Sequence, residues 1–358
     1  MALNPTSVEF FKRLLSLAGP SGYESSPARA WREEAKAFAD EVWADVNGNS
    51  FAAINRDAEP RVMLAGHVDE IGLMINHIDD DGFLYFSPIG GWDPEIVVGQ
   101  RVEILARDGT IPGVIGKKAI HLQEKGDRDK ASKIKDLWID IGARDGKGAR
   151  GRVRVGDAAV LRADVIELPN DRIVSRSVDN RMGALIALEA LRRLAEDRPT
   201  AHVVATATAQ EEIGFGVGGG ARPGAYGLDP QVAIVIDVTH ATDHPGAEKK
   251  GHGDHRVGGG PVLSRGSAVN PVLFERLVET AEREKIPFSI EATPSRTSTD
   301  ADSIFTTRLG IATALVSVPN RYMHSPNEMV SLDDLDRAAQ LIATTIRTLR
   351  ADDSFVPG

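Results

Sequence analysis

The stretch "VVATATAQEEIGFGVGGG", residues 203–220, decides the fold and raises the question of function. Its small and β-branched residues are typical of a buried strand. Two adjacent carboxylates, Glu211 and Glu212, follow that strand, and glycines follow them. Like charges at a strand end resist burial, so solvent, a cation or a metal must compensate them. Three interpretations are open: a solvated strand end, the acid pair of a glycosidase, or one metal ligand beside one proton acceptor.

Alternating strands and helices surround this stretch. Amphipathic helix patterns occupy 5–18, 26–42, 181–197, 271–285 and a segment from Ser331 onward, and apolar strand patterns occupy 50–56, 61–67, 202–209, 232–237 and 311–318. This alternation predicts an α/β fold with a mainly parallel sheet. Ser331 with Asp334 fits a capping box at the start of the last helix.

The middle of the chain has a different sequence pattern. Short β-branched runs there are broken by Gly, Pro and Asp-Gly, which predicts small antiparallel β structure. A chain of 358 residues is also long for one core. We therefore expect a discontinuous α/β domain of residues 1–70 and 165–358, interrupted by a β-rich insertion of residues 71–164.

Composition excludes several classes of function. The net charge is −10 without a long basic run, which argues against nucleic-acid and anionic-membrane partners. The chain has no cysteine, so a metal site must use His, Asp and Glu. Its N-terminal pattern is interrupted by Lys12 and Arg13 and indicates a surface helix rather than a signal peptide. No stretch has the length of a membrane span, so a cytoplasmic protein is expected.

Potential metal ligands follow the ends of the apolar strands. In open α/β sheets this edge is where sites form, so the side chains can converge there. The set comprises His67, Glu211, Glu212, Asp237 and His324, with Asp179 directly before a helix. Two His and three of these four carboxylates suit zinc or a similar divalent ion better than magnesium.

The number of ligands suggests two ions. Five ligands exceed the number that one catalytic zinc usually binds, and a bridging carboxylate would let two ions share the five. One of the adjacent pair then remains as a base, and Glu211 could take a proton from water and pass it to the leaving amine. Asp69, two residues after His67, could accept the free N–H of that histidine.

Five ordered motifs carry a family resemblance. They are "AGHVDEIGLMI", "SVDNRMG", "AQEEIG", "VIDVTHATD" and "HSPNE", and the similarity runs from about residue 5 to about residue 350. The chain resembles the tetrahedral aminopeptidases, which are dinuclear metallopeptidases also called glutamyl or deblocking aminopeptidases; some relatives carry an endoglucanase label. One departure is "FGVGGGARPGAY" after "QEEIG", where the family often has an "LRGA"-like continuation.

The resemblance implies specific roles. His67 and Asp237 would bind one metal, Glu212 and His324 the other, and Asp179 would bridge both. Asp69 would support His67, and Glu211 would be the general base. It also implies two divalent ions per chain, zinc or cobalt, peptide substrates, and a PDZ-like insertion that forms dimers and from them a dodecamer.

Other interpretations stand beside this one. Gly214, Gly216 and Gly219 form a G-x-G-x-x-G pattern before Asp237, as in a dinucleotide-binding oxidoreductase, but "ARPGAYGLDPQ" is a poor helix and the two glutamates have the wrong charge. A glycoside hydrolase needs separated carboxylates and leaves the histidines unexplained. A non-catalytic binding module would not need the complete ligand set.

The remaining polar residues have plainer explanations. His240, His244, His252 and His255 lie in polar loops and are expected to be solvated, although that loop could border the pocket. His121 in the insertion is expected to be exposed. Residues 298–303, "STDADS", fit either a substrate pocket or a plain turn.

Overall fold

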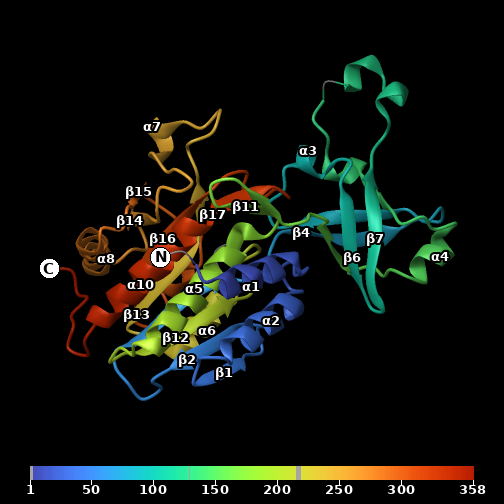
Figure 1. The fold of residues 1–358 in the computed structure, drawn as a ribbon. Helices are drawn as coiled ribbons and strands as arrows, with labels where there is room; N and C mark the ends of the chain where they lie inside the picture. The colour runs from blue at the N-terminus through green and yellow to red at the C-terminus, as the bar shows by residue number, and fades with distance from the viewer. Residues whose placement is uncertain (1–2, 129, 215–218) are drawn as a thin grey trace.

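The computed structural model describes residues 3–128, 130–214 and 219–358. A large sheet with helices on its faces forms the body of the molecule, and a smaller group of strands, containing β4, β6 and β7, stands to one side of it (Figure 1). Among the described residues no helix combines the length and the hydrophobicity needed to cross a membrane.

The large sheet has eight strands in the order β1-β2-β12-β3-β13-β16-β14-β15. Its centre, β12-β3-β13-β16, is parallel, whereas β2 runs antiparallel to β12 and β14 runs antiparallel to β16. The mainly parallel α/β sheet expected from the sequence is therefore confirmed. The strands are β1 (Glu41–Ala44), β2 (Ser50–Ile54), β3 (Arg61–His67), β12 (His202–Thr208), β13 (Val232–His240), β14 (Val262–Gly266), β15 (Ser289–Thr293) and β16 (Ala312–Asn320).

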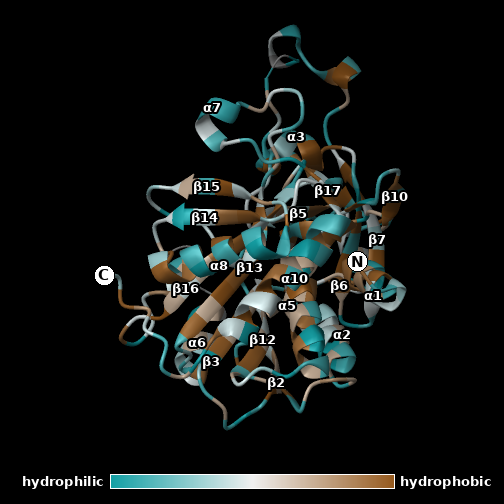
Figure 2. Ribbon diagram, turned by 60° about the vertical axis from the view of Figure 1, so that its left-hand side comes forward, coloured by the Kyte–Doolittle hydropathy of each residue, from teal (hydrophilic) through white to brown (hydrophobic). Residues whose placement is uncertain are grey.

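Helices bury both faces of this sheet. In β3, Val62 and Leu64 pack into the core on one face, and Met63 and Ala65 pack into the core on the other, as the two-residue period of a strand requires. Figure 2 shows the hydrophobic central strands behind helices that carry both hydrophilic and hydrophobic residues. The first face is covered by α1 (Pro5–Ser16), α2 (Ser25–Ala35), α5 (Val178–Glu196), α8 (Pro271–Glu284) and α10 (Leu332–Thr348), and the second by α6 (Ala221–Leu228) and α9 (Ala301–Ile304).

The second β system is a closed barrel with the order β4-β5-β8-β7-β6-β9. Its own core contains Leu73, Ile104 and Ile139, all fully buried. The strands are β4 (Gly72–Ile78), β5 (Leu84–Ile89), β6 (Arg101–Ala106), β7 (Gly109–Gly116), β8 (Trp138–Asp140) and β9 (Ala158–Leu161). Between them lie α3 (Pro94–Val97), α4 (Gly146–Arg150) and the 3₁₀ turns η1 (Ile120–Leu122), η2 (Lys125–Asp127) and η3 (Ile134–Asp136).

Closure of the barrel leaves its described strands without a free edge, because every strand pairs with a neighbour on both sides. Among the aromatic residues of this segment, Phe86 is buried in the barrel core and Tyr85 is exposed. Phe83 and Trp92 are partly buried, and the Trp92 indole donates a 2.8 Å hydrogen bond to the Gly72 carbonyl.

A three-stranded antiparallel sheet adjoins the body and helps to build the site. It contains β10 (Ile166–Leu168), β11 (Arg172–Ser175) and β17 (Glu328–Ser331), with β11 in the middle. Ser175 pairs with Glu328 across β11 and β17. This pairing brings the segment that enters α5 beside the segment that follows β16. The short α7 (Lys249–His252) lies in a separate loop.

Three local expectations are wrong. The helix expected over 26–42 ends at Ala35, because residues 41–44 pair with β2 as strand β1. Ser331 precedes α10, but its hydroxyl has no hydrogen-bond partner among the described residues, and Asp334 instead accepts hydrogen bonds from the N–H groups of Gly258 and Gly260. The capping box therefore does not form.

The third concerns the segment after the glycines, which we expected not to form a helix. It forms α6, whose third residue is Pro223. Proline is tolerated there because the N–H groups of the first turn have no acceptor within the helix. Gly216 of the G-x-G-x-x-G pattern lies outside the described residues.

Candidate metal centre

The side chains expected to bind metal converge at the carboxyl edge of the parallel strands. His67 is the last residue of β3, Asp237 lies near the end of β13, and Glu212 follows β12. Asp179 lies in the first turn of α5, and His324 lies between β16 and β17. The parallel register of β12, β3 and β13 brings three of these segments to one edge, as the topology of such sheets predicts.

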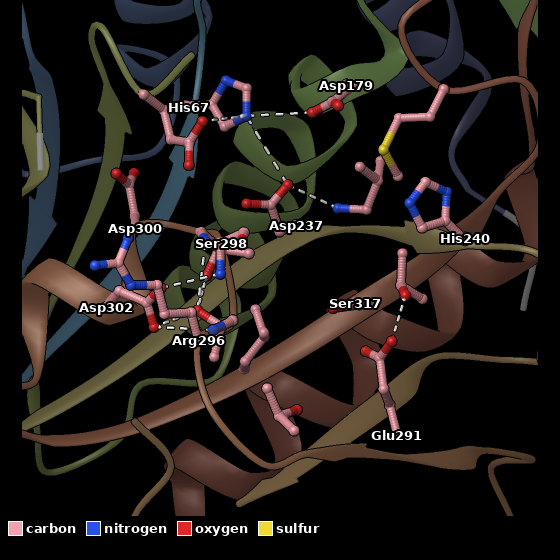
Figure 3. Close-up of a pocket in the computed structure, with 18 of the residues that line it drawn as sticks. His67, Asp179, Asp237, His240, Glu291, Arg296, Ser298, Asp300, Asp302 and Ser317 are labelled. Carbon is pink, nitrogen blue, oxygen red and sulfur yellow. Dashed lines mark hydrogen bonds and ion pairs between the residues drawn. The ribbon is translucent and has the colours of Figure 1, made fainter. Parts of the chain in front are cut away.

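Asp179 lies between the two histidines. Its Oδ1 atom is 3.2 Å from His67 Nε2, and its Oδ2 atom is 3.4 Å from His324 Nε2. Glu212 Oε2 is 3.4 Å from His324 Nε2, and Asp237 Oδ1 is 3.9 Å from His67 Nε2. The cluster therefore divides into two halves, each with one imidazole and one terminal carboxylate, that share Asp179. Figure 3 shows the His67 half.

Local backbone structure fixes the position of Asp179. Asp179 and Asn180 have non-helical backbone angles, so the regular part of α5 begins after them. The Asn180 side-chain oxygen accepts a 3.0 Å hydrogen bond from Gly183 N–H and thereby caps the helix. Its amide group donates a 2.8 Å hydrogen bond to the Ile236 carbonyl. One side chain thus joins the segment of Asp179 to the strand that carries Asp237.

The donor set fits a divalent cation. Ligand atoms of His67, Asp179 and Glu212 all lie within 4.8 Å of one another, and the three residues are buried. Glu212 Oε1 is buried and has no hydrogen-bond partner among the described residues. A buried, unpartnered carboxylate oxygen is unfavourable unless a cation binds it. Imidazole and carboxylate groups suit zinc and related ions.

Asp69 has a wider role than the sequence suggested. Its Oδ1 atom lies 3.3 Å from His67 Nδ1, and its two oxygens accept hydrogen bonds of 3.2 and 3.1 Å from the N–H groups of Glu211 and Glu212. The hydroxyl of Ser21 donates a further hydrogen bond to it. Fully buried, Asp69 therefore fixes the backbone of the glutamate pair beside the His67 ring.

Glu328 was not identified from the sequence. This buried carboxylate accepts a 2.9 Å hydrogen bond from Asp179 N–H on one oxygen and a 2.9 Å hydrogen bond from His324 N–H on the other. It connects two potential ligands that are far apart in the chain. Its place in "HSPNE" is the only sequence signal that could have indicated it.

Glu24 was also missed, and Asp300 was noted only as part of the segment "STDADS". Glu24 accepts hydrogen bonds from the N–H groups of Gly22 (2.7 Å) and Gln210 (3.1 Å). Asp300 accepts a 2.6 Å hydrogen bond from the Thr208 hydroxyl at the end of β12. Burial raises the pKa of Glu24 to about 7, with help from Asp69, and burial raises the pKa of Asp300 to about 6. Both support the strand end that carries the glutamate pair.

The protonation pattern of the cluster follows from burial and close charges. Burial raises the pKa of Glu211 and the pKa of Asp237 well above their usual values. His67 opposes both shifts, and acidic neighbours raise both pKa values further. Burial would lower the pKa of His324, but Asp179 and Glu212 outweigh it and raise that pKa to about 11. Without a cation the site therefore retains protons that a bound metal would displace.

The cluster opens into a pocket of about 730 Å³. Ser298, Thr299, Asp300, Asp302 and Ser303 line it, so the segment "STDADS" borders the pocket rather than forming a remote turn. His240 and His252 also line it. His255, expected to be solvated, is instead buried, with its ring Nδ1 2.8 Å from Ser289 Oγ. His121 is exposed as expected.

Comparison with known proteins identifies the family. The family model described as M42 glutamyl aminopeptidase matches residues 48–341. The chain belongs to the M42 glutamyl aminopeptidase family. A lysyl aminopeptidase of Pyrococcus furiosus is 35% identical over 353 residues, which cover 98% of this chain and 99% of that relative. This M42 chain is therefore a peptidase with aminopeptidase relatives, as the five motifs predicted, and neither the glycoside hydrolase nor the oxidoreductase alternative is favoured.

Solved structures agree with this assignment. A TET aminopeptidase from a marine sediment Thaumarchaeota archaeon superposes with a TM-score of 0.91 at 32% identity, covering 96% of each chain. The TET1 peptidase of Pyrococcus horikoshii, described as able to assemble into a tetrahedron or a large octahedral shell, gives a TM-score of 0.85 at 31% identity, covering 96% of this M42 chain and 100% of that one.

Proposed function

We propose that this M42 chain is a dinuclear metalloaminopeptidase that removes residues one at a time from the free N-termini of peptides. The observation that carries the proposal is the position of Asp179, whose two oxygens face two different histidines at 3.2 and 3.4 Å. His67 and Asp237 would bind one ion, Glu212 and His324 the other, and Asp179 would bridge both. Zinc suits this set best, and cobalt is an alternative.

The chain's own residues would supply the proton transfer. When bound, the ions supply Lewis acidity that polarises the scissile carbonyl and lowers the pKa of a water molecule. Glu211 Oε2 lies 3.8 Å from His67 Nε2, beside the ligand cluster. Burial raises the pKa of Glu211, which favours a group that accepts a proton from water and returns it to the leaving amine. Asp69 would hold Glu211 in place by accepting a hydrogen bond from the Glu211 backbone N–H.

A homo-oligomeric assembly belongs to the same proposal. The similar TET1 peptidase is described as able to assemble into a tetrahedron or a large octahedral shell, and we propose a dodecamer built from dimers. The segment 71–164 would act as the PDZ-like dimerisation domain and residues 1–70 and 165–358 as the catalytic domain. The exposed apolar side chains Val114, Ile120 and Leu122 support an interface on this segment.

The preferred N-terminal residue does not follow from the relatives. The family description names glutamyl substrates, whereas the Pyrococcus furiosus relative is a lysyl aminopeptidase. These side chains carry opposite charges. The identity of the preferred residue must therefore come from the pocket of this chain.

A substrate panel tests the proposal. Purified protein loaded with zinc or cobalt is offered fluorogenic aminoacyl amides with a free α-amino group and the same compounds with the amine acetylated. We expect hydrolysis of the free amines only, loss of turnover on chelation, and recovery when the metal is returned. Cleavage of the acetylated compounds, activity in the chelated protein, or release of reducing sugar from cellulose would contradict it.

A further inference from the structure

One acidic side chain in the pocket belongs neither to the ligand cluster nor to the glutamate pair. Glu291, on the edge strand β15, is half-buried and lines the pocket. Its Oε1 atom accepts a 2.8 Å hydrogen bond from the Thr239 hydroxyl, and its Oε2 atom lies 3.5 Å from the Ser264 hydroxyl. Because hydroxyl groups donate to both oxygens, the carboxylate is held in a fixed position as an acceptor.

Thr239 connects Glu291 with the metal centre. It lies two residues after Asp237 on β13, so both side chains project from the same face of the strand. Two strand residues span roughly 6.7 Å. The Glu291 carboxylate accepts its hydrogen bond from the residue that lies this far along β13 from Asp237. An extended lysine side chain spans about 6 Å from Cα to Nζ, which suits this separation.

The pocket lining has a composition that suits a long cationic side chain. Leu315 and Met323 line the same pocket and provide apolar surface. The methylene groups of Lys and Arg pack on such surface while the charged end reaches a polar partner. Burial lowers the pKa of His240, and His252 lowers it further although Glu291 opposes the shift, which favours the neutral form of His240.

Arg296 is the competing charge in the pocket. It is exposed, and Figure 3 places it on the side of Asp300 and Asp302, away from Glu291. Glu291 is half-buried, anchored by hydroxyl groups, and in the described part of the chain no Lys or Arg forms an ion pair with it. A fixed, partly desolvated charge discriminates between substrates more strongly than an exposed, flexible one.

We propose that Glu291 makes the pocket select N-terminal residues with a cationic side chain, lysine or arginine. The proposal rests on the aminopeptidase activity proposed above and names its substrate class. The Glu291 carboxylate binds the ammonium or guanidinium group, while the apolar wall contacts the methylene chain. Acidic N-terminal residues are rejected because they meet a carboxylate of the same charge.

The test compares kcat/KM for fluorogenic amides of lysine, arginine, norleucine and glutamate. Norleucine matches the lysine chain without its charge. We expect the wild type to prefer lysine over norleucine by roughly 10- to 100-fold, as a hydrogen-bonded charge pair provides. Glu291→Gln should remove most of that preference while norleucine turnover stays within a few-fold. Glu291→Lys should shift the preference towards glutamate.

Two controls separate the possible failures. Arg296→Gln alters the other pocket charge and should leave the lysine preference intact. Norleucine turnover in every variant reports folding and catalysis independently of selectivity. A wild type that cleaves norleucine but prefers glutamate, or a Glu291→Gln variant with undiminished lysine preference, overturns this proposal alone. No turnover of any of the four substrates overturns the proposed function together with it.

Discussion

Glu328 lies behind Asp179, and its Oε2 atom accepts a 2.9 Å hydrogen bond from the Asp179 backbone N–H. The other oxygen accepts from His324 N–H at the same distance, so a single carboxylate fixes two potential ligands. In Glu328→Gln an amide NH₂ group replaces one of the two accepting oxygens, so one of these backbone N–H groups would face a donor and lose its hydrogen bond. We expect metal affinity to fall about 10- to 100-fold, the range typical for residues that orient ligands. Titration calorimetry with zinc measures this.

The matched control for that variant is Glu279→Gln, on the exposed side of α8. It makes the same chemical change away from the site and should bind metal as the wild type does. Equal affinities in Glu328→Gln and Glu279→Gln would show that Glu328 does not position the ligands.

Substitution of Asp179 tests the bridge. Since Asp179 faces both histidines, Asp179→Ala should weaken the binding of both ions, whereas His67→Ala should weaken the binding of mainly one ion. Elemental analysis after dialysis against a fixed free-zinc concentration gives the stoichiometry of each variant. Full occupancy of both metal sites in Asp179→Ala would exclude the bridging role.

Glu24 predicts a pH dependence of stability in the metal-free protein. Its pKa is raised from 4.5 to about 7 by burial and by Asp69. A carboxyl with a raised folded-state pKa contributes its full stability below the unfolded pKa and loses it as pH rises through the folded pKa. The wild type should therefore lose stability between about pH 4.5 and about pH 7 from this group.

Glu24→Gln stays neutral over that range. The free energy of unfolding of the variant, relative to the wild type, should rise as pH increases and become constant at higher pH. Urea unfolding at a series of pH values measures this difference. Two parallel stability curves would show that Glu24 does not titrate in the folded protein.

The proposed assembly predicts a particle far larger than the 38.5 kDa chain. Light scattering on the purified protein measures it directly. Deletion of residues 71–164 should leave small species with little peptidase activity, because the exposed apolar side chains of this segment would no longer form an interface. A stable, fully active monomer of the complete chain would contradict the assembly.

Much of the fold was predictable because it depends on local pattern. The two-residue alternation of β3 and the amphipathic helices determine which faces are buried, and the strand ends then locate His67, Glu212 and Asp237. Closure of the barrel was not predictable. It depends on pairing between β4 and β9, which are far apart in the sequence.

The supporting residues escaped prediction for a related reason. Glu328 and Glu24 act through backbone N–H groups of distant segments, and such contacts leave no periodic pattern. The expected capping box failed because tertiary contacts with Gly258 and Gly260 take up the Asp334 carboxylate. Strand pairing with β2 likewise ended the second helix earlier than its local pattern indicated.

The most direct test of the account separates the two adjacent glutamates. Metal content and turnover are measured on Glu211→Gln and Glu212→Gln under the same conditions. If Glu211 is the base and Glu212 a ligand, Glu211→Gln retains both ions and loses turnover by about 10²- to 10⁴-fold, whereas Glu212→Gln loses metal. Metal loss in Glu211→Gln together with full metal in Glu212→Gln would contradict the assignment.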